Sequence, residues 1–171
     1  MGRYMTMSDA LLPEFDHEIS TTRKLLERVP DEKWGWTPHE KSMTLGRLAC
    51  HVAETTQFAA AVANTDSMDF AKGDYKRIDA SGRKQLLEAF DKMAAEAHAA
   101  IAASKDEDMG KPWSLLFDGK PVMTMPKAGV LRTAMMNHLI HHRGQLSVYL
   151  RLTDTPVPSI YGPSADEGNM A

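Results

Sequence analysis

Three histidines fall within five residues of the segment Asn137–Gln145, and their side chains are the strongest candidates for chemistry in this chain. If residues 130–152 form a helix with about 100° between successive residues, His138 and His142 lie about 40° apart on its apolar face. His141 then falls at the polar border of that face. Two imidazoles one turn apart on a core-facing surface are costly to bury unless something binds them. The simplest such partner is a metal ion.

A third histidine, His51, is predicted to face the same core from another helix. That helix is expected to begin near Ser42 or Thr44, because either residue can cap a helix start. Leu48 and Val62 share the side of the helical wheel on which His51 lies. Three neutral imidazoles and one open position describe a catalytic type of zinc site, and the same nitrogen set also suits nickel, copper or iron. We therefore predict one divalent transition metal, zinc or nickel, although each histidine taken alone could be an ordinary hydrogen-bonded core residue.

Glu54 and Gln145 are the candidates for supporting or catalytic roles beside this site. Glu54 follows His51 by one turn and could orient that imidazole by accepting its second N–H. Gln145 lies beside His138 on the helical wheel and could line a pocket. A solvated carboxylate and an amide that caps the polar end of the helix seam are the alternatives. Cys50 points about 100° away from His51 and is a poor ligand.

Segments with helical periodicity must position these residues. They cover residues 8–29, a stretch from residue 42 or 44 to about 62, residues 81–103 and residues 126–152. Between the last two, Trp113–Phe117 and Pro121–Met125 flank the dipeptide Asp118–Gly119, which is typical of a tight turn. The predicted fold is all-α: an antiparallel four-helix bundle with a short hairpin or ordered loop between its third and fourth helices. The tail from Thr153 onward is predicted to be extended.

Composition narrows the class of protein. A chain of 171 residues with 43% hydrophobic residues fits a single domain over residues 1–171. A formal net charge of −3 and the lack of a basic cluster argue against nucleic acid as a partner. No apolar run approaches the roughly 20 residues of a membrane span, and the first residues lack the apolar core of a signal peptide. With Cys50 as the lone cysteine, we expect a cytoplasmic protein without a membrane partner.

Four blocks of the sequence resemble the DinB superfamily, also described as DinB/YfiT-like metalloenzymes. The histidine block His138–Leu146 resembles the signature of that family. Glu18–Glu27 is similar to its first helix, Trp36–His51 to its second block, and Val157–Glu167 to the tails of a large subgroup. Because the four blocks occur in the family's order, the resemblance covers nearly the whole chain.

This resemblance implies a four-helix bundle, a metal held by His51, His138 and His142, and a homodimer. The helical wheels select the same three histidines, and no ligand position is substituted. Characterised relatives include metal-dependent transferases that use small cellular thiols, so the resemblance implies a thiol cofactor and a small-molecule substrate. Ile140 and Val148, apolar residues off the main face of the last helix, give weak independent support for a dimer.

Two other functions stay open at this point. The first is a metal-dependent hydrolase, in which the fourth ligand is water with a lowered pKa. The second is a non-catalytic metal-binding module of a stress response. A carboxylate placed as a base near the metal would favour hydrolysis, whereas a roomy pocket with cationic and amide groups would favour thiol transfer. A site closed by four protein ligands would favour the non-catalytic module.

Overall fold

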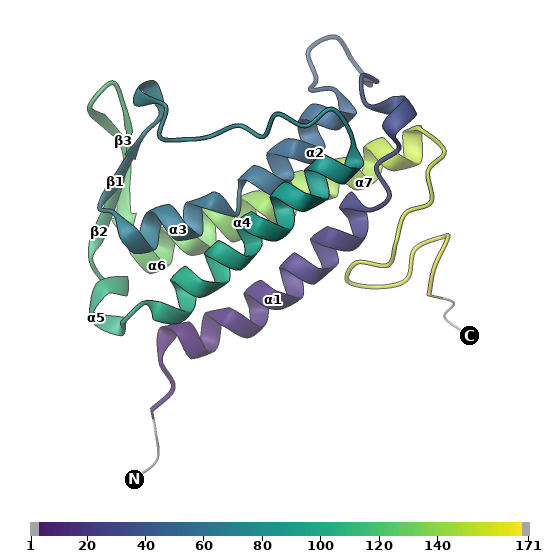
Figure 1. Cartoon of the computed structure of the whole chain (residues 1–171). Coiled ribbons are helices and arrows are strands. Elements are labelled where there is room, and N and C mark those ends of the chain that lie inside the picture. Colours follow the sequence, from purple (N-terminus) through teal and green to yellow (C-terminus); the bar gives the residue numbers. More distant parts are fainter. Residues whose placement is uncertain (1–3, 169–171) are drawn as a thin grey trace.

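Long helices lie side by side in the computed structural model, which describes residues 4–168, and a small sheet stands at one end of them (Figure 1). α1 packs against α4 and α7, while α2 and α3 pack against α4 and the last helical segment. The helical elements are α1 (Met7–Leu26), η1 (Asp31–Lys33), α2 (Leu45–Glu54), α3 (Gln57–Asn64), η2 (Phe70–Lys72), α4 (Arg83–Ala103), α5 (Asp106–Met109), α6 (Lys127–Val130), η3 (Leu131–Asn137) and α7 (His138–Leu152).

The start of α2, which carries His51, is fixed by the loop before it. The Thr44 side chain accepts the backbone N–H of the third helical residue, as expected for a helix cap. Leu45 N–H donates to the Trp36 carbonyl at 2.8 Å, and Gly46 N–H donates to the Trp34 carbonyl at 2.9 Å. The Trp34 ring lies so close to Gly46 that a Cβ atom there would be 2.3 Å from it. Glycine is therefore the residue that lets the ring pack on the first turn.

The second predicted helix divides into α2 and α3 at Thr55 and Thr56. The Thr55 hydroxyl donates to the Val52 carbonyl at 2.7 Å, and the Thr56 hydroxyl donates to the Ala53 carbonyl at 2.8 Å. Such side-chain bonds to nearby carbonyls compete with the regular helical ladder. Both threonines are buried, and the irregular turn follows directly after Glu54.

The last predicted helix, residues 126–152, is present but is not regular throughout. α6 continues into a π-helical segment, η3, and then into α7, which begins at His138. A π segment closes its hydrogen bonds over one extra residue, so it rotates the helix that follows relative to the helix before it. This irregularity lies immediately before the first histidine of the motif.

The prediction of an all-α four-helix bundle is wrong, because the helices are joined by a three-stranded mixed sheet. β2 (Pro112–Phe117) pairs antiparallel with β3 (Lys120–Pro126), and β1 (Ser67–Asp69) pairs parallel with β2. The hairpin turns at Asp118 and Gly119, where both φ angles are positive, at 51° and 73°. The predicted hairpin is thus confirmed, but the three-residue strand that extends it is too short to show a periodic pattern.

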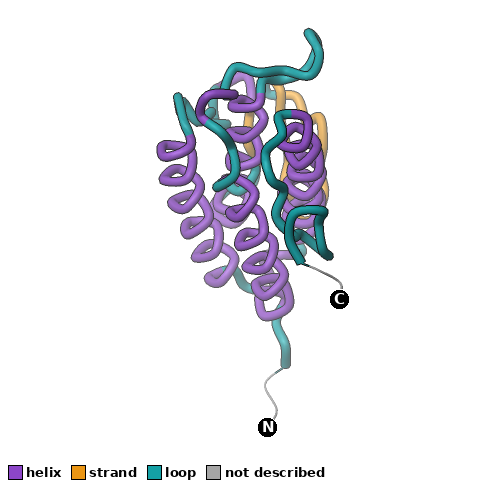
Figure 2. The backbone as a smooth tube through the Cα atoms, turned by 90° about the vertical axis from the view of Figure 1, so that its right-hand side faces the viewer, coloured by secondary structure: helices purple, strands orange, loops and turns teal. Residues whose placement is uncertain are grey.

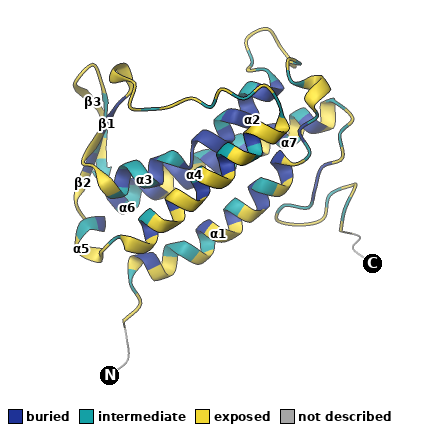
Figure 3. Ribbon diagram, viewed as in Figure 1, coloured by how far each residue is buried: buried dark blue, intermediate teal, exposed yellow. Residues whose placement is uncertain are grey.

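Buried residues lie along the sides of the helices that face one another, and exposed residues lie along their outer faces (Figure 3). One core cluster includes Leu48 and Leu146, and a second includes Phe58, Met135 and the fully buried Trp113 of β2. His138 and His142 lie between members of the second cluster in η3 and members of the first cluster in α7, whereas His51 lies among residues of the first cluster. The described residues include no helix long and apolar enough to cross a membrane.

The tail after α7 is a loop that folds back onto α1 (Figure 2). Tyr161 in this tail donates its hydroxyl to Glu18 of α1 at 2.8 Å. Arg151 pairs with Asp166, with Nη2 and Oδ2 2.5 Å apart. The extended tail that the sequence predicts is therefore tied down by polar contacts, as far as residue 168.

Candidate metal centre

The side chains of His51, His138 and His142 meet between α2 and α7. His138 Nε2 lies 3.2 Å from His51 Nε2 and 2.8 Å from His142 Nε2. One nitrogen from each ring lies within 4.8 Å of those of the other two. Two nitrogens bound tetrahedrally at about 2.0–2.1 Å from a zinc ion are roughly 3.3 Å apart, so both distances lie within about half an ångström of that value. The three predicted ligands therefore form one group that could hold a metal ion.

Hydrogen bonds at the outer ring nitrogens leave the inner nitrogens free to bind an ion. His142 Nδ1 lies 2.7 Å from Gln145 Oε1, an oxygen that can only accept, so Nδ1 carries the proton. His51 Nδ1 lies 3.3 Å from the Tyr75 hydroxyl and 3.6 Å from Glu54 Oε2. In both rings this arrangement places the Nε2 lone pair on the side that faces the other histidines. Partners of this kind fix the tautomer and orientation of metal-binding histidines.

Burial favours the neutral form of His138 and of His142. Burial first, and then the neighbouring His142 and His51, lower the pKa of His138 to about 4. Burial also lowers the pKa of His142, although its bond to Gln145 acts in the opposite direction. The rings of His138 and His142 are therefore neutral near pH 7, and a neutral imidazole can bind a cation through its lone pair without first losing an extra proton.

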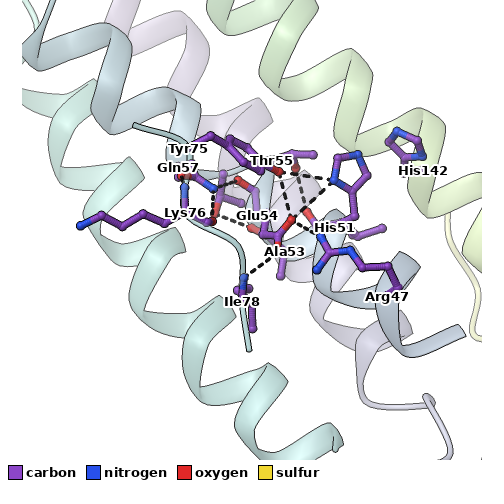
Figure 4. Close-up of polar contacts among 12 residues, drawn as sticks. Arg47, His51, Ala53, Glu54, Thr55, Gln57, Tyr75, Lys76, Ile78 and His142 are labelled. Carbon is purple, nitrogen blue, oxygen red and sulfur yellow. Dashed lines mark hydrogen bonds and ion pairs between the residues drawn. The ribbon is translucent and has the colours of Figure 1, made fainter. Parts of the chain in front are cut away.

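Glu54 is fully buried directly behind His51 (Figure 4). It forms an ion pair with Arg47, accepts the Ile78 backbone N–H at 2.6 Å and accepts the Tyr75 hydroxyl at 3.1 Å. Burial alone would raise the pKa of this carboxyl, but hydrogen bonds from His51, Arg47 and Ile78 outweigh burial and lower it. Glu54 is thus an ionised carboxylate whose oxygens are engaged on the side of His51 that faces away from the other histidines.

The other residues that the sequence analysis considered lie outside the group of three histidines. Gln145 is exposed and bonds to His142, whereas the helical wheel had placed it beside His138. His141 is exposed, with its ring 4.9 Å from that of His142 and outside the group of three. Cys50 is buried, and burial raises the pKa of its thiol to about 11, so it is neither a ligand nor a reactive thiol.

The structure corrects the predicted face of the last helix. His138 and His142 are half-buried at the edge of the apolar stripe, which is formed in α7 by Leu139, Leu146 and Leu150. The wheel assumed a regular helix from residue 130, but the π segment η3 interrupts it. The histidines are therefore turned away from the core centre, toward the surface of the molecule.

Arg143 is a functional candidate that the sequence reasoning missed. It is 1% exposed and pairs with the buried Glu18, with Nη2 and Oε2 2.6 Å apart. It also donates to the Tyr161 hydroxyl at 2.7 Å and to the Thr22 hydroxyl at 3.2 Å. This network ties α7 to α1 and to the tail, one residue after His142. One feature of the sequence could have predicted the burial of Arg143: on the helical wheel it lies about 60° from Leu146, on the apolar side of the helix.

Two hollows border the histidines. The larger, of about 650 Å³, is lined by residues that include His51 and His138. The smaller, of about 450 Å³, is lined by residues that include His142, Gln145 and Tyr149. Met43 lines both hollows. The ring nitrogens are thus reached from two sides, in contrast to a site sealed within a core.

The fold is mainly helical, and its half-buried group of three histidines borders two hollows. These features define a helical protein with a candidate metal-binding site. Comparison with known proteins makes this specific: residues 14–146 match the DinB superfamily, and the chain belongs to that superfamily. The membership of this superfamily that the sequence predicts is therefore confirmed.

Individual relatives agree with this assignment. The chain is 28% identical over 159 residues to the uncharacterized protein YrdA of Bacillus subtilis (strain 168), covering 93% of this chain and 90% of the relative. A DinB-like protein from Bacillus cereus ATCC 10987 has a similar crystal structure, with a TM-score of 0.71, 26% identity, and coverage of 93% of this chain and 100% of the other. The DinB-like protein YjoA of Bacillus subtilis shares the fold, with a TM-score of 0.70, 20% identity, and coverage of 88% and 96%.

Proposed function

We propose that this protein binds one divalent transition ion, zinc or nickel, through His51, His138 and His142 and transfers a small thiol to an electrophile. The convergence of one ring nitrogen from each of three histidines, on two helices, carries the proposal. A divalent ion held there lowers the pKa of a coordinated thiol and so supplies a thiolate nucleophile at neutral pH. A cytoplasmic location, where small thiols are kept reduced, agrees with this activity.

The site has room for a ligand that the protein does not supply. Among the described residues, no fourth histidine, cysteine, aspartate or glutamate joins the group of three. Catalytic sites keep such a position open, whereas structural sites are closed by four protein ligands. This arrangement favours an enzyme over a non-catalytic metal-binding module.

Transfer between two molecules fits the surroundings better than hydrolysis does. Glu54, the nearest carboxylate, is already bound by Arg47, Tyr75 and Ile78 and lies behind His51, so it is badly placed to act as a base on a water molecule. The two hollows offer separate space for a thiol and for an acceptor. The larger one also presents arginine side chains, which suit a charged substrate.

Metal analysis of protein purified without a polyhistidine tag tests the proposed centre. We expect about one ion per chain and loss of tight binding in each of the variants His51→Ala, His138→Ala and His142→Ala. His141→Ala is the matched control, because His141 lies on the same helix but outside the group, and it should keep the ion. Loss of the ion in His141→Ala together with retention in His142→Ala would contradict the assignment.

Thiol consumption tests the proposed reaction. The metal-loaded protein is mixed with a panel of small thiols and an electrophile such as 1-chloro-2,4-dinitrobenzene, and turnover is compared with that of the metal-free protein. We expect turnover that needs both the ion and the thiol. If the ion is bound but no thiol supports turnover, and nitrophenyl esters are cleaved instead, hydrolysis is the better assignment.

A further inference from the structure

Aromatic rings from separate elements form the wall of the larger hollow. Phe58 of α3, Phe70 of η2 and Tyr75 of the following connection contact one another, with ring centroids 5.2–6.2 Å apart. Phe117, at the end of β2, lines the same hollow. A wall of this kind offers flat apolar surface, against which an aromatic ring can stack or pack edge-to-face.

Several of these apolar side chains are exposed to water at the rim. Phe117 is 60% exposed, Phe70 is 41% exposed and Met43, across the hollow, is 40% exposed. Isolated exposed apolar residues are ordinary, but a group of them around one hollow is typical of a binding site. A bound apolar molecule would cover surface that otherwise faces water.

The rim is held in place by a buried carboxylate, Asp69. Its side chain accepts the Asp118 and Gly119 N–H groups of the hairpin turn, at 3.1 and 2.8 Å, next to Phe117. It also accepts the Ala71 N–H at 3.0 Å, which fixes the turn that carries Phe70. One buried side chain therefore positions two rim aromatics from distant parts of the chain, so the hollow is preformed.

The charge of the hollow is positive. Arg47 and Arg77 both line it, together with the single carboxylate Glu54, so two positive charges and one negative charge leave a net charge of +1. Arg47 is paired with Glu54. Arg77 is exposed and makes no ion pair or side-chain hydrogen bond within residues 4–168. Its guanidinium is therefore available to a ligand, and an ion at the histidines would add further positive charge.

From these features we infer that the larger hollow binds a small organic anion with a flat apolar body, of the aromatic carboxylate class. The rings of Phe70, Tyr75 and Phe117 contact the apolar body, and Arg77 pairs with the carboxylate. A volume of about 650 Å³ lies within the range of roughly 300–1,000 Å³ that small-molecule sites occupy. The inference goes beyond the proposed function, because binding of this anion needs neither the ion nor a thiol.

Binding of 2-naphthoate and of its neutral amide, 2-naphthamide, tests the inference without any turnover. Titration calorimetry on the metal-free protein should show tighter binding of the anion than of the amide. Arg77→Gln should weaken the binding of naphthoate about tenfold or more and leave naphthamide within about twofold, because only the charged pair is lost. Phe117→Ala should weaken both. Arg132→Gln, which removes an arginine paired with Glu14 outside the hollow, is the matched control and should change neither.

Metal content and circular dichroism on the same samples separate this inference from the proposed function. If folded protein binds naphthoate no better than naphthamide, or if Arg77→Gln leaves naphthoate binding unchanged, the inference is overturned, whatever the metal content. If preference for the anion occurs only in metal-loaded protein and does not need Arg77, the ion is the anion receptor and the inference is also overturned. If the parent protein binds naphthoate through Arg77 but takes up no metal ion, the proposed function alone is contradicted.

Discussion

Replacing Glu54 by glutamine tests how the protein supports its candidate metal centre. The change keeps the shape of the side chain and removes its charge. Glu54 is fully buried, and its Oε2 atom lies 3.6 Å from His51 Nδ1 and contacts both Arg47 and Tyr75. A glutamine presents one oxygen and one NH2 group, so its NH2 must face either the Ile78 N–H at the Oε1 position or the donors from Arg47 and Tyr75 at the Oε2 position.

The geometry sets the expected size of the effect on metal binding. Removing a partner of a metal-binding histidine costs 10–100-fold in affinity, or about 1.4–2.7 kcal/mol. We expect a loss in this range for Glu54→Gln, because the carboxylate both fixes the tautomer of His51 and raises the basicity of its Nε2. The variant should still bind the ion, unlike His51→Ala.

The effect on the free energy of unfolding is expected to be moderate. Breaking a fully buried ion pair costs about 3–5 kcal/mol, because it leaves an unpaired charge in the core. The Arg47 side chain is 30% exposed, so water can solvate part of the charge that loses its partner. We therefore expect a loss of about 1–2 kcal/mol for the metal-free variant.

Competition with a chromogenic chelator measures the affinity, and urea unfolding of the metal-free protein followed by circular dichroism measures the stability. Glu14→Gln is the matched control, because Glu14 pairs with Arg132 at the surface, where its side chain is 41% exposed. That control should change stability by less than about 0.5 kcal/mol and leave the affinity unchanged. If Glu54→Gln folds normally and binds the ion within twofold of the parent protein, the carboxylate does not support His51 and the reasoning is refuted.

Three further results are expected. Gly46→Ala should lower the free energy of unfolding, measured with urea, by about 1–3 kcal/mol and change tryptophan fluorescence, because its new methyl group overlaps the Trp34 ring. Burial raises the pKa of Asp69, but surrounding backbone N–H groups outweigh it and lower the pKa, so its contribution to stability is present above the unfolded-state pKa and is lost as pH falls through the folded-state pKa. Urea midpoints at pH 7 and pH 3 should therefore differ less in Asp69→Asn than in the parent. Finally, light scattering should give a dimer of the 19.0 kDa chain, and Val148→Glu, at a position of α7 that is 56% exposed, should give the monomer mass; a parent mass near 19.0 kDa would contradict the dimer.

Much of the candidate metal centre could be predicted because its sequence signal is local. His138 and His142 are one turn apart on a single helix, and His51 lies on the inward side of another, so periodicity selects all three. Arg143 shows the limit of this reasoning. An arginine next to a histidine pair reads as solvated, and its burial depends on Glu18 and Tyr161, which are 125 and 18 residues away in sequence. Only the tertiary fold makes an arginine stable in that core.

In the fold too, local features could be predicted from the sequence and long-range contacts could not. The positions of the long helices agree with the apolar periodicity. The hairpin turn is recognisable in the sequence because the dipeptide Asp118–Gly119 favours positive φ angles, which both residues adopt. β1 has three residues, and its pairing with β2 depends on a contact between segments about 47 residues apart. The connection that supplies Tyr75 and Ile78 to Glu54 has no periodicity at all. Its place is decided by the buried carboxylate that it covers, which the sequence alone does not reveal.

The irregular helix before His138 explains why the helical wheel placed the histidines too far into the core. Leu131 and Met135 are anchored in the core, and a regular α-helix continuing from them would carry His138 into the same apolar face. The π segment adds one residue, which turns α7 by about 100° relative to that frame. Leu146 and Leu150 then fill the core, and the histidines move to its edge, beside the hollows. A half-buried position suits the proposed centre, because full burial would close it to a substrate and full exposure would leave its ligands loosely held.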